Sequence, residues 1–432
     1  MSADHLTTLA QGRKLHVLVI MTRDPHGQMS GRIMVLQTIL RSLSALGHVV
    51  TVAGFDLPCA TSARSDASGG VVAYHALAHA GKFERAVSLG CALLFGHVSM
   101  NEALYSSRRA RRTIADLVKT QGFDVVVTDM IRTARYGKDS GLAWIADLDD
   151  LLSDRYARMA ADETAPPVSL GYLNAPFLSR LAAGFNLLGR WVLRREAKVL
   201  RLRERTIAQQ AGLVTLVSGT EAEALSLSSG TKVVATPMSI PAPQEQITLQ
   251  GRPAELVFLG GLDYAGNFNA LRNFDTNVRP RLAALGLKDV TLDVIGFAPQ
   301  SQREKFSSAI RFLGYVDPLY TVLQGYRFML VPQVTPGGIK TKIGVAARAG
   351  TVVLAHVTAT EGMALTDGKD VLVWDRPEDL VALIASLRAN DIDASMIARN
   401  AQDWVENYFG EAKLQHLWQR NLDLCLQHAA RD

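Results

Sequence analysis

Two successive series of short apolar runs, each alternating with amphipathic helical stretches, constrain the fold of this chain most strongly. Unbroken apolar runs of this length are typical of parallel strands buried on both faces, and the helical stretches between them supply the crossover connections. In the first series the predicted strands are residues 16–21, 49–54, 124–128, 142–146 and 213–217. The first half of the chain is therefore predicted to be a doubly wound α/β domain.

A second series begins after residues 236–255, a polar stretch with four prolines that we interpret as a linker. Its predicted strands are residues 256–260, 290–295, 310–313, 328–332, 351–355 and 370–373. The predicted domains are 1–240 and 251–411, with a C-terminal helix at 412–432 that packs back on the first domain. Two such sheets carry loops at their strand ends, which predicts two Rossmann-like domains facing a cleft.

Length, charge and cysteine content limit the class of protein. With 432 residues the chain exceeds one ordinary core, and its net charge of +5 fits an anionic partner. Cys59, Cys91 and Cys425 lack metal-ligand spacing, which favours a reducing compartment. The N-terminus does not read as a signal peptide, and no apolar run reaches about 18 residues. We expect a cytoplasmic protein that can still contact the inner face of the membrane.

Several blocks occur in a recognisable order along nearly the whole chain. They include "GQMSGRIMVLQTILRSLSALGHVVTV", "TLVSGTEAEAL", "ELVFLGGLDYAGNFNALRNF", "GGIKTKIGVAARAG" and "ATEGMAL". This series resembles bacterial glycosyltransferases of the GT-B architecture, of the family 4 type used in exopolysaccharide assembly. The resemblance implies transfer of a sugar from a nucleotide-sugar donor, held mainly by the second domain, to an acceptor held mainly by the first.

The stretch "GGIKTKIGVAARAG" is the predicted phosphate end of the donor site. Gly337 and Gly338 let the backbone approach a ligand, and a helix starting near Thr341 would aim its N–H groups at a diphosphate. Lys340 and Lys342 add positive charge, and Lys342 aligns with the lysine of the family. The alternative reading is a solvated helix start.

Other predicted donor residues follow the strands of the second domain. Gly260 and Gly261 end the strand at 256–260, while Glu361 and Gly362 match a recurring element of the family. Asn267 either contacts the donor or caps the helix that follows. Glu361 is either a donor contact or a helix-start carboxylate near the dipole.

The sequence departs from the resemblance at positions that usually bind the donor. Val345 and Gly337 stand where the family has glutamates, and Gly261 stands where an arginine is common. Charge for the diphosphate must then come from Lys340, Lys342 or elsewhere. Both stereochemical outcomes, inversion and retention, remain open.

Acidic residues cluster at the end of the strand predicted at 142–146. Asp147, Asp149 and Asp150 stand where doubly wound folds place ligands, and an inverting transfer needs a carboxylate base. We predict that this cluster is catalytic, with Asp147 or Asp149 first. The alternative is an acidic helix start paired with Arg155 and Arg158.

The remaining site residues lie in loops of the first domain. His26 is a candidate base or hydrogen-bond donor, or simply a solvated histidine. Gly31 and Arg32, with Asp129 and Arg132 after the strand at 124–128, are predicted acceptor contacts.

Residues 178–205 combine apolar side chains and a tryptophan with eight Arg or Lys. Such a helix can lie in an anionic membrane interface, or it can be an ordinary packed helix whose basic stems cover apolar surface. Nucleic-acid binding is not expected, because aromatic stacking residues do not interleave with the basic ones.

Taken with the resemblance, these observations predict a metal-independent glycosyltransferase without a cofactor, acting on a glycan or lipid-linked acceptor in surface polysaccharide synthesis. Two other functions stay open. One is a nucleotide-sugar epimerase of the same architecture, and the other is a catalytically silent nucleotide-binding scaffold, suggested by the missing glutamates.

Overall fold

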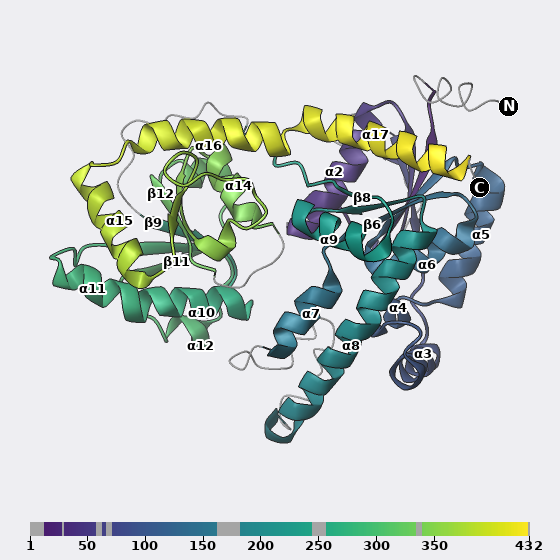
Figure 1. Cartoon of the computed structure of the whole chain (residues 1–432), viewed down its shortest axis with the longest axis horizontal. Coiled ribbons are helices and arrows are strands. Elements are labelled where there is room, and N and C mark those ends of the chain that lie inside the picture. The colour runs from purple at the N-terminus through teal and green to yellow at the C-terminus, as the bar shows by residue number, and fades with distance from the viewer. Residues whose placement is uncertain are drawn as a thin grey trace. The chain divides into compact units, whose positions relative to one another are not determined.

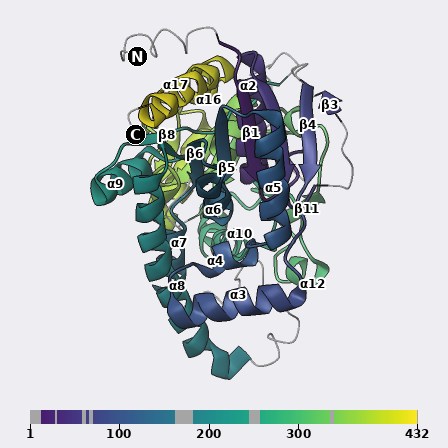
Figure 2. The ribbon, with the colours of Figure 1, turned by 90° about the vertical axis from the view of Figure 1, so that its right-hand side faces the viewer.

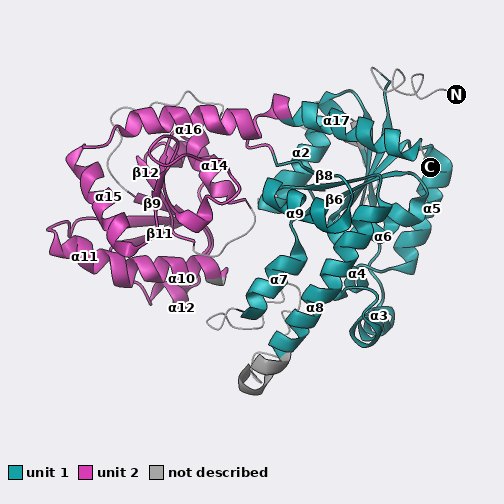
Figure 3. Ribbon diagram, in the orientation of Figure 1, with its two compact units in different colours: residues 1–238, 414–432 teal, residues 239–413 magenta. Residues whose placement is uncertain are grey.

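A computed structural model describes residues 13–27, 30–57, 63–65, 71–161, 182–243, 256–333 and 339–430 (Figure 1). The chain forms two compact units (Figure 3). Unit 1 comprises Met1–Met238 and Leu414–Asp432, and unit 2 comprises Ser239–Lys413. Each unit is built on one sheet flanked by helices.

The sheet of unit 1 has the strand order β3-β4-β2-β1-β5-β6-β7-β8. Its strands are β1 (His16–Met21), β2 (Val49–Gly54), β3 (Ala63–Ser65), β4 (Val71–Ala76), β5 (Val125–Asp129), β6 (Ala143–Asp149), β7 (Leu213–Leu216) and β8 (Val233–Ala235). All neighbours are parallel except β3 and β4. Residues of β5 are buried throughout, as expected for a central strand covered on both faces. The predicted doubly wound α/β half is confirmed, although the strand β4 and the three-residue strands β3 and β8 were not predicted.

The helices of unit 1 cover this sheet and extend below it. They are α2 (Gly31–Ala45), α3 (Lys82–Phe95), α4 (Met100–Leu104), α5 (Arg108–Gln121), α6 (Met130–Ser140), α7 (Leu152–Ala161), α8 (Ala182–Gln210) and α9 (Gly219–Ser229). The last helix, α17 (Glu411–Ala429), belongs to unit 1 from Leu414 onward. There the Asn421 amide donates to Thr236 Oγ1 at 2.9 Å.

The sheet of unit 2 has the order β11-β10-β9-β12-β13-β14, and all its paired strands are parallel. Counted from β9, this is the 3-2-1-4-5-6 order of a Rossmann sheet. The strands are β9 (Leu256–Leu259), β10 (Leu292–Ile295), β11 (Ile310–Gly314), β12 (Phe328–Val331), β13 (Val352–His356) and β14 (Leu372–Trp374). The helices are α10 (Ala265–Asn273), η2 (Phe274–Val278), α11 (Arg279–Ala284), α12 (Gln300–Arg303), α13 (Leu319–Leu323), α14 (Thr341–Arg348), η3 (Val357–Ala359), α15 (Pro377–Ala389) and α16 (Ala394–Phe409).

Both sheets have a point where the strand order reverses. In unit 1 it lies between β1 and β5, and in unit 2 between β9 and β12. Doubly wound sheets bind ligands at the carboxyl ends of the strands beside such a point. Functional side chains are therefore expected at these two edges.

Candidate functional site

A buried arginine lies at the reversal point of unit 1. Arg32 stands in the first turn of α2, and its side chain is only 5% exposed. Its Nε donates to Asp129 Oδ1 at 2.7 Å and its Nη2 to Asp147 Oδ2 at 2.8 Å. Its Nη1 lies 3.4 Å from Asp149 Oδ1. One guanidinium thus ties the start of α2 to the carboxyl ends of β5 and β6.

Two threonines hold the same carboxylates from the other side. The backbone N and Oγ1 of Thr22 donate to Asp129 Oδ2 at 2.7 and 2.5 Å, and Thr215 Oγ1 donates to Asp147 Oδ1 at 2.8 Å. Burial acts to raise the pKa of Asp129, but Arg32 and Thr22 outweigh it and lower that pKa. Burial also raises the pKa of Asp147, and here it prevails over Arg32.

These contacts change the roles expected for three residues. The side chains of Asp129 and Asp147 are each 1% exposed, and both oxygens of each carboxylate are hydrogen-bonded. A substrate hydroxyl therefore has no free oxygen to approach. This placement corrects the prediction that Asp147 is a base and that Arg32 and Asp129 contact an acceptor, because all three are committed to one another.

Asp149 differs from its neighbours in the acidic cluster. It has a φ of 69°, and the pairing of β6 with β7 shifts register just before it. A positive φ is unusual for a residue other than glycine and often marks a functional position. The Asp149 side chain is 19% exposed, whereas Asp150 forms an ion pair with Arg155. Asp149 is thus the member of the cluster that both reaches solvent and lies beside Arg32.

The other predicted residues of unit 1 are spread along the same edge. His26 is exposed in the turn after β1, with its Nε2 2.9 Å from the Tyr74 hydroxyl. Gly31 is the first residue of α2. Arg132 is 3% exposed, and its Nε donates to Asn101 Oδ1 at 3.3 Å. The buried position of Arg132 corrects the prediction that it contacts an acceptor.

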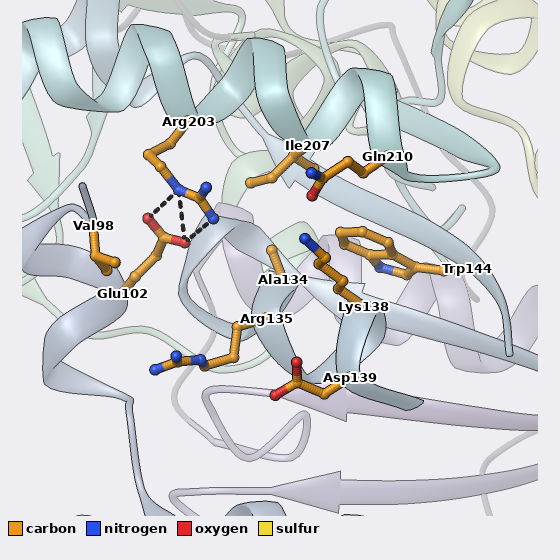
Figure 4. A pocket seen from close by; sticks show the side chains of 10 residues that line it. All are labelled: Val98, Glu102, Ala134, Arg135, Lys138, Asp139, Trp144, Arg203, Ile207 and Gln210. Carbon is orange, nitrogen blue, oxygen red and sulfur yellow. Dashed lines mark hydrogen bonds and ion pairs between the residues drawn. The ribbon is translucent and has the colours of Figure 1, made fainter. Parts of the chain in front are cut away.

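Unit 1 also has a cavity of about 240 Å³ between α4, α6 and α8 (Figure 4). Trp144, near the amino end of β6, forms part of its wall, so the cavity lies away from the strand ends that carry Asp149. In that wall the Arg203 guanidinium donates to both oxygens of Glu102, the shortest contact being 2.8 Å. This pairing satisfies the charges of Arg203 and Glu102 within the cavity wall.

At the reversal point of unit 2 the central side chain is Lys342, in the first turn of α14. Its Nζ donates to Asn267 Oδ1 at 3.3 Å and lies 4.9 Å from the centroid of the Phe258 ring. Burial, with a smaller contribution from Lys340, lowers the pKa of Lys342 to about 7. The described residues give this lysine no carboxylate partner, so an anion is the ligand that would complete its surroundings.

Asn267 organises this cluster around Lys342. It lies within α10, so the prediction that it caps that helix is wrong, and Tyr264 occupies the cap position. The Asn267 Nδ2 donates to the Gly261 carbonyl at 2.8 Å, and its Oδ1 accepts from Gln333 Nε2 at 2.8 Å. Gln333, two residues after the end of β12, was not predicted from the sequence, because a lone glutamine after a strand carries no specific signal.

Two glycines provide the space for this arrangement. Gly260 has a φ of 152°, and a Cβ added there would lie 2.6 Å from Asn267 Nδ2 and 3.2 Å from Lys342 Nζ. Gly296, which follows β10, has a φ of 137°, and a Cβ added there would lie 2.7 Å from the Gly260 carbonyl carbon. Such distances are too short for any other residue type, so the backbone of the two loops can meet only at glycine.

Gly296→Ala is expected to destabilise unit 2 by about 3 kcal/mol, because it combines an unfavourable φ with a backbone clash. Urea unfolding measures this change. Gly286→Ala is the matched control, since Gly286 also has a positive φ (83°) but has open space where the Cβ would stand. Equal destabilisation by the two substitutions would contradict the close approach at Gly296.

The remaining donor predictions lie around the same edge or outside the described residues. Gly337 and Gly338 fall outside them. Lys340 is half-buried and directly precedes α14. Glu361 and Gly362 are exposed in a turn after η3, where no helix begins, so a dipole contact for Glu361 is not present. Within the described ranges, no three potential metal ligands converge.

The family described as glycosyl transferases group 1 matches residues 253–390 of the chain, the part that contains the Lys342 cluster. None of the curated protein sequences matches the chain significantly.

Solved structures match nearly the full chain. HepE of Anabaena in complex with UDP and glucose has 13% identity and a TM-score of 0.59, covering 94% of this chain and 99% of its own. Sucrose-phosphate synthase of Thermosynechococcus elongatus has 14% identity and a TM-score of 0.62, covering 94% and 98%. A UDP-forming α,α-trehalose-phosphate synthase of Burkholderia vietnamiensis has 12% identity and a TM-score of 0.57, covering 94% and 99%.

At these identities the structural matches establish the fold, and the family match adds the class for the second unit. The chain has the GT-B fold, as the sequence predicted, and its residues 253–390 match the glycosyl transferases of group 1. No helix in the described ranges is both long enough and apolar enough to span a membrane.

Proposed function

We propose that this protein transfers a sugar from a nucleotide-sugar donor, bound by unit 2, to a glycan or lipid-linked acceptor bound by unit 1, in surface polysaccharide synthesis. The observation that carries the donor half is Lys342, a half-buried lysine with no carboxylate partner among the described residues. It lies within the matched family region. HepE has been solved with UDP and with UDP-glucose, which supports a uridine nucleotide sugar as donor.

In the proposed donor site the diphosphate lies at the start of α14. Protonated Lys342 supplies positive charge, and the free N–H groups of the helix start add partial charge. Asn267 positions the Lys342 ammonium, and Gly260 leaves room for these two side chains at the end of β9. Lys340, Gly337, Gly338, Glu361 and Gly362 belong to the same proposed site. With a lysine and a helix start serving the diphosphate, transfer without a metal ion is part of the proposal.

For the acceptor we propose Asp149 as the base. The Asp149 carboxylate takes the proton of the acceptor hydroxyl while that oxygen attacks the anomeric carbon. The bond from the anomeric carbon to the diphosphate oxygen breaks, and the nucleoside diphosphate leaves with the bonding electrons. The Arg32 Nη1 lies 3.4 Å from the Asp149 Oδ1. His26 is the second candidate, because it is exposed on the same edge of the sheet.

The function is tested by a ligand panel followed by an activity assay. Nucleoside diphosphates and nucleotide sugars are screened by thermal shift, since a selective ligand raises stability in proportion to RT ln(1 + [L]/Kd). Release of nucleoside diphosphate from the selected donor is then measured with and without a bacterial lipid extract as acceptor. Release that requires the extract supports transfer. Conversion of the donor to an epimer without any release would contradict it, and binding without turnover would favour a silent scaffold.

Lys342→Met is expected to weaken binding of the nucleoside diphosphate by about 10- to 100-fold, the loss of one charge-assisted contact. Isothermal titration calorimetry measures the affinity. Lys369→Met, at an exposed lysine of the same unit, is the control and should bind as the wild type does. Unchanged affinity in Lys342→Met would remove this lysine from the site.

Binding of the nucleoside diphosphate is also expected to weaken as the pH rises above about 7. The pKa of Lys342 is about 7 without ligand, and a bound phosphate would raise it, so binding takes up a proton above that pH. Calorimetry at pH 8 in buffers of different ionisation enthalpy measures this uptake. Lys342→Arg keeps its charge and should show less uptake. Equal uptake in the two proteins would assign the proton to another group.

A further inference from the structure

Helix α3 of unit 1 presents an uncovered apolar face. Of its described side chains only Ala92 is buried. Phe83, Val87 and Leu94 follow at helical spacing on the outward face and are 83%, 49% and 77% exposed. Phe95 extends this face and is 67% exposed. Residues 86–95 contain no charged side chain, so the helix offers a continuous apolar strip to its surroundings.

Contacts with the rest of unit 1 fix the position of α3, and with it the apolar strip formed by Phe83, Val87, Leu94 and Phe95. Figure 2 shows α3 lying across one end of the unit, beside α4 and α8. At its start, Glu84 Oε1 accepts from the backbone N of Arg108 at 2.9 Å. At its end, the Arg195 guanidinium donates to the Ala92 carbonyl at 3.1 Å. The rest of the unit therefore anchors the inner side of α3.

Exposed basic side chains flank the strip at both ends. Arg108, Arg109 and Arg112 are exposed at the start of α5, which adjoins the start of α3 through Glu84. On α8, next to the end of α3, Arg194 and Lys198 are exposed. Trp191, one turn before Arg194, is 55% exposed. A protruding apolar helix between cationic flanks has the composition of an interfacial membrane helix.

We propose that α3 docks unit 1 on an anionic lipid bilayer, with its apolar strip in the interface and the flanking arginines and lysines on lipid phosphates. The side chains of the strip are largely exposed, which suits insertion into a deformable lipid surface. The basic α8 segment, predicted from the sequence as a membrane contact or a packed helix, buries Leu193, Ala197 and Leu200 and contributes charge beside α3. The docking surface does not depend on sugar transfer.

The first test is flotation of the full-length protein with vesicles of phosphatidylcholine, with and without phosphatidylglycerol. Binding is expected only when phosphatidylglycerol is present, and it should weaken in high salt. The double variant Phe83→Gln/Leu94→Gln is expected to lose at least about tenfold in partitioning. Leu227→Gln, an 80% exposed leucine on α9, is the matched control and should bind as the wild type does.

Charge variants separate the contribution of the flanking basic side chains from that of the apolar strip. Arg108→Gln/Arg109→Gln/Arg112→Gln should bind phosphatidylglycerol vesicles no better than plain phosphatidylcholine. Binding by Phe83→Gln/Leu94→Gln equal to wild type would overturn the proposal. So would a wild-type dimer in analytical ultracentrifugation that this double variant abolishes, because the strip would then be covered by a second copy. Unchanged nucleotide binding by the variants keeps this result separate from the proposed function.

The second test uses a cysteine that already lies on the strip. Cys91 is exposed on α3, whereas Cys425 is fully buried with a pKa raised to about 12, so Cys91 reacts selectively once Cys59→Ser is introduced. A nitrobenzoxadiazole label at Cys91 should gain fluorescence and shift to the blue on phosphatidylglycerol vesicles. Brominated lipid should quench it. A label whose spectrum stays unchanged while the protein floats with vesicles would place the contact elsewhere and overturn the proposal.

Discussion

Replacing Arg32 by methionine is expected to lower the free energy of unfolding of unit 1 by about 3 to 5 kcal/mol, the cost of leaving buried charges without their partner. In the native protein one guanidinium serves Asp129, Asp147 and Asp149 at 2.7 to 3.4 Å. Methionine has a similar length and fills much of the space, so the main change is electrostatic. Asp129 and Asp147 would then be buried side by side with only Thr22 and Thr215 as donors.

The loss of unfolding free energy in Arg32→Met should be larger at pH 7 than at pH 5. In the native protein the pKa of Asp129 is lowered, so its contribution to stability is present above its ordinary pKa of 3.8 and disappears as the pH falls through the lower folded value. In Arg32→Met the opposing charge is gone and only the hydrogen bonds from Thr22 and Thr215 act against burial, so the pKa of both carboxylates is expected to rise. The variant should therefore gain stability as the pH falls from 7 towards 5, and the difference from wild type should narrow.

Urea unfolding followed by circular dichroism at pH 7 and pH 5 measures both effects. Arg155→Met is the matched control, because Arg155 also pairs with an aspartate, Asp150, but its side chain is 48% exposed. A change of about 1 kcal/mol or less is expected there. If Arg32→Met were equally mild at pH 7, the Arg32 cluster would not hold α2 on the sheet.

The strands were predictable because their burial appears directly in the sequence. The run at 16–21 became β1 with matching bounds, and the alternation of apolar runs with helices led to both doubly wound sheets. The strands β3 and β8 escaped prediction because each has only three residues, too few for a recognisable apolar run. The six-residue strand β4 was missed as well. The edge strands β11 and β14 of unit 2 were predicted at 310–313 and 370–373, so a position at the edge of a sheet does not by itself hide a strand.

The role of the charged residues could not be read from the same pattern. Arg32 and Asp147 are 115 positions apart, and no local sequence pattern near either residue indicates that their side chains form a hydrogen bond. Each was predicted to act on or contact a substrate, and for Asp147 the reason was that doubly wound folds place ligands at this edge of the sheet. What decided the outcome is that β1, β5 and β6 are neighbours, which brings the start of α2 against two acidic strand ends. The sequence correctly placed these side chains at the carboxyl ends of the strands, but it could not predict that they form ion pairs with one another.

The donor edge shows the same limit for a different reason. Lys342 was predicted as a phosphate contact from its place before a helix of small residues, and that assignment stays a prediction. Burial lowers its pKa, and two of the residues that surround it, Phe258 and Asn267, come from elements more than 70 residues earlier in the chain. Val345, where the resembling family has a glutamate, is buried in α14 and offers no group to a ribose. Contacts to the sugar must therefore come from other residues.

Asp149→Asn is expected to reduce turnover by about 100- to 10,000-fold, the usual contribution of a general base. Asparagine tolerates a positive φ, so the backbone at φ 69° should be kept, and the change removes the proton acceptor together with the charge beside Arg32. Affinity for the nucleoside diphosphate should not change, because Lys342 and its neighbours belong to unit 2. Initial rates of nucleoside diphosphate release, with calorimetry for binding, separate these two effects.

Two further variants make this result specific. Asp154→Asn changes a 39% exposed aspartate on α7 and should retain wild-type turnover. His26→Gln tests the second candidate base. If Asp149→Asn kept its turnover while His26→Gln lost it, the base would be the histidine on the loop after β1. A defect in both would indicate that the two groups share one acceptor site, because each then acts on the same hydroxyl from its own strand end.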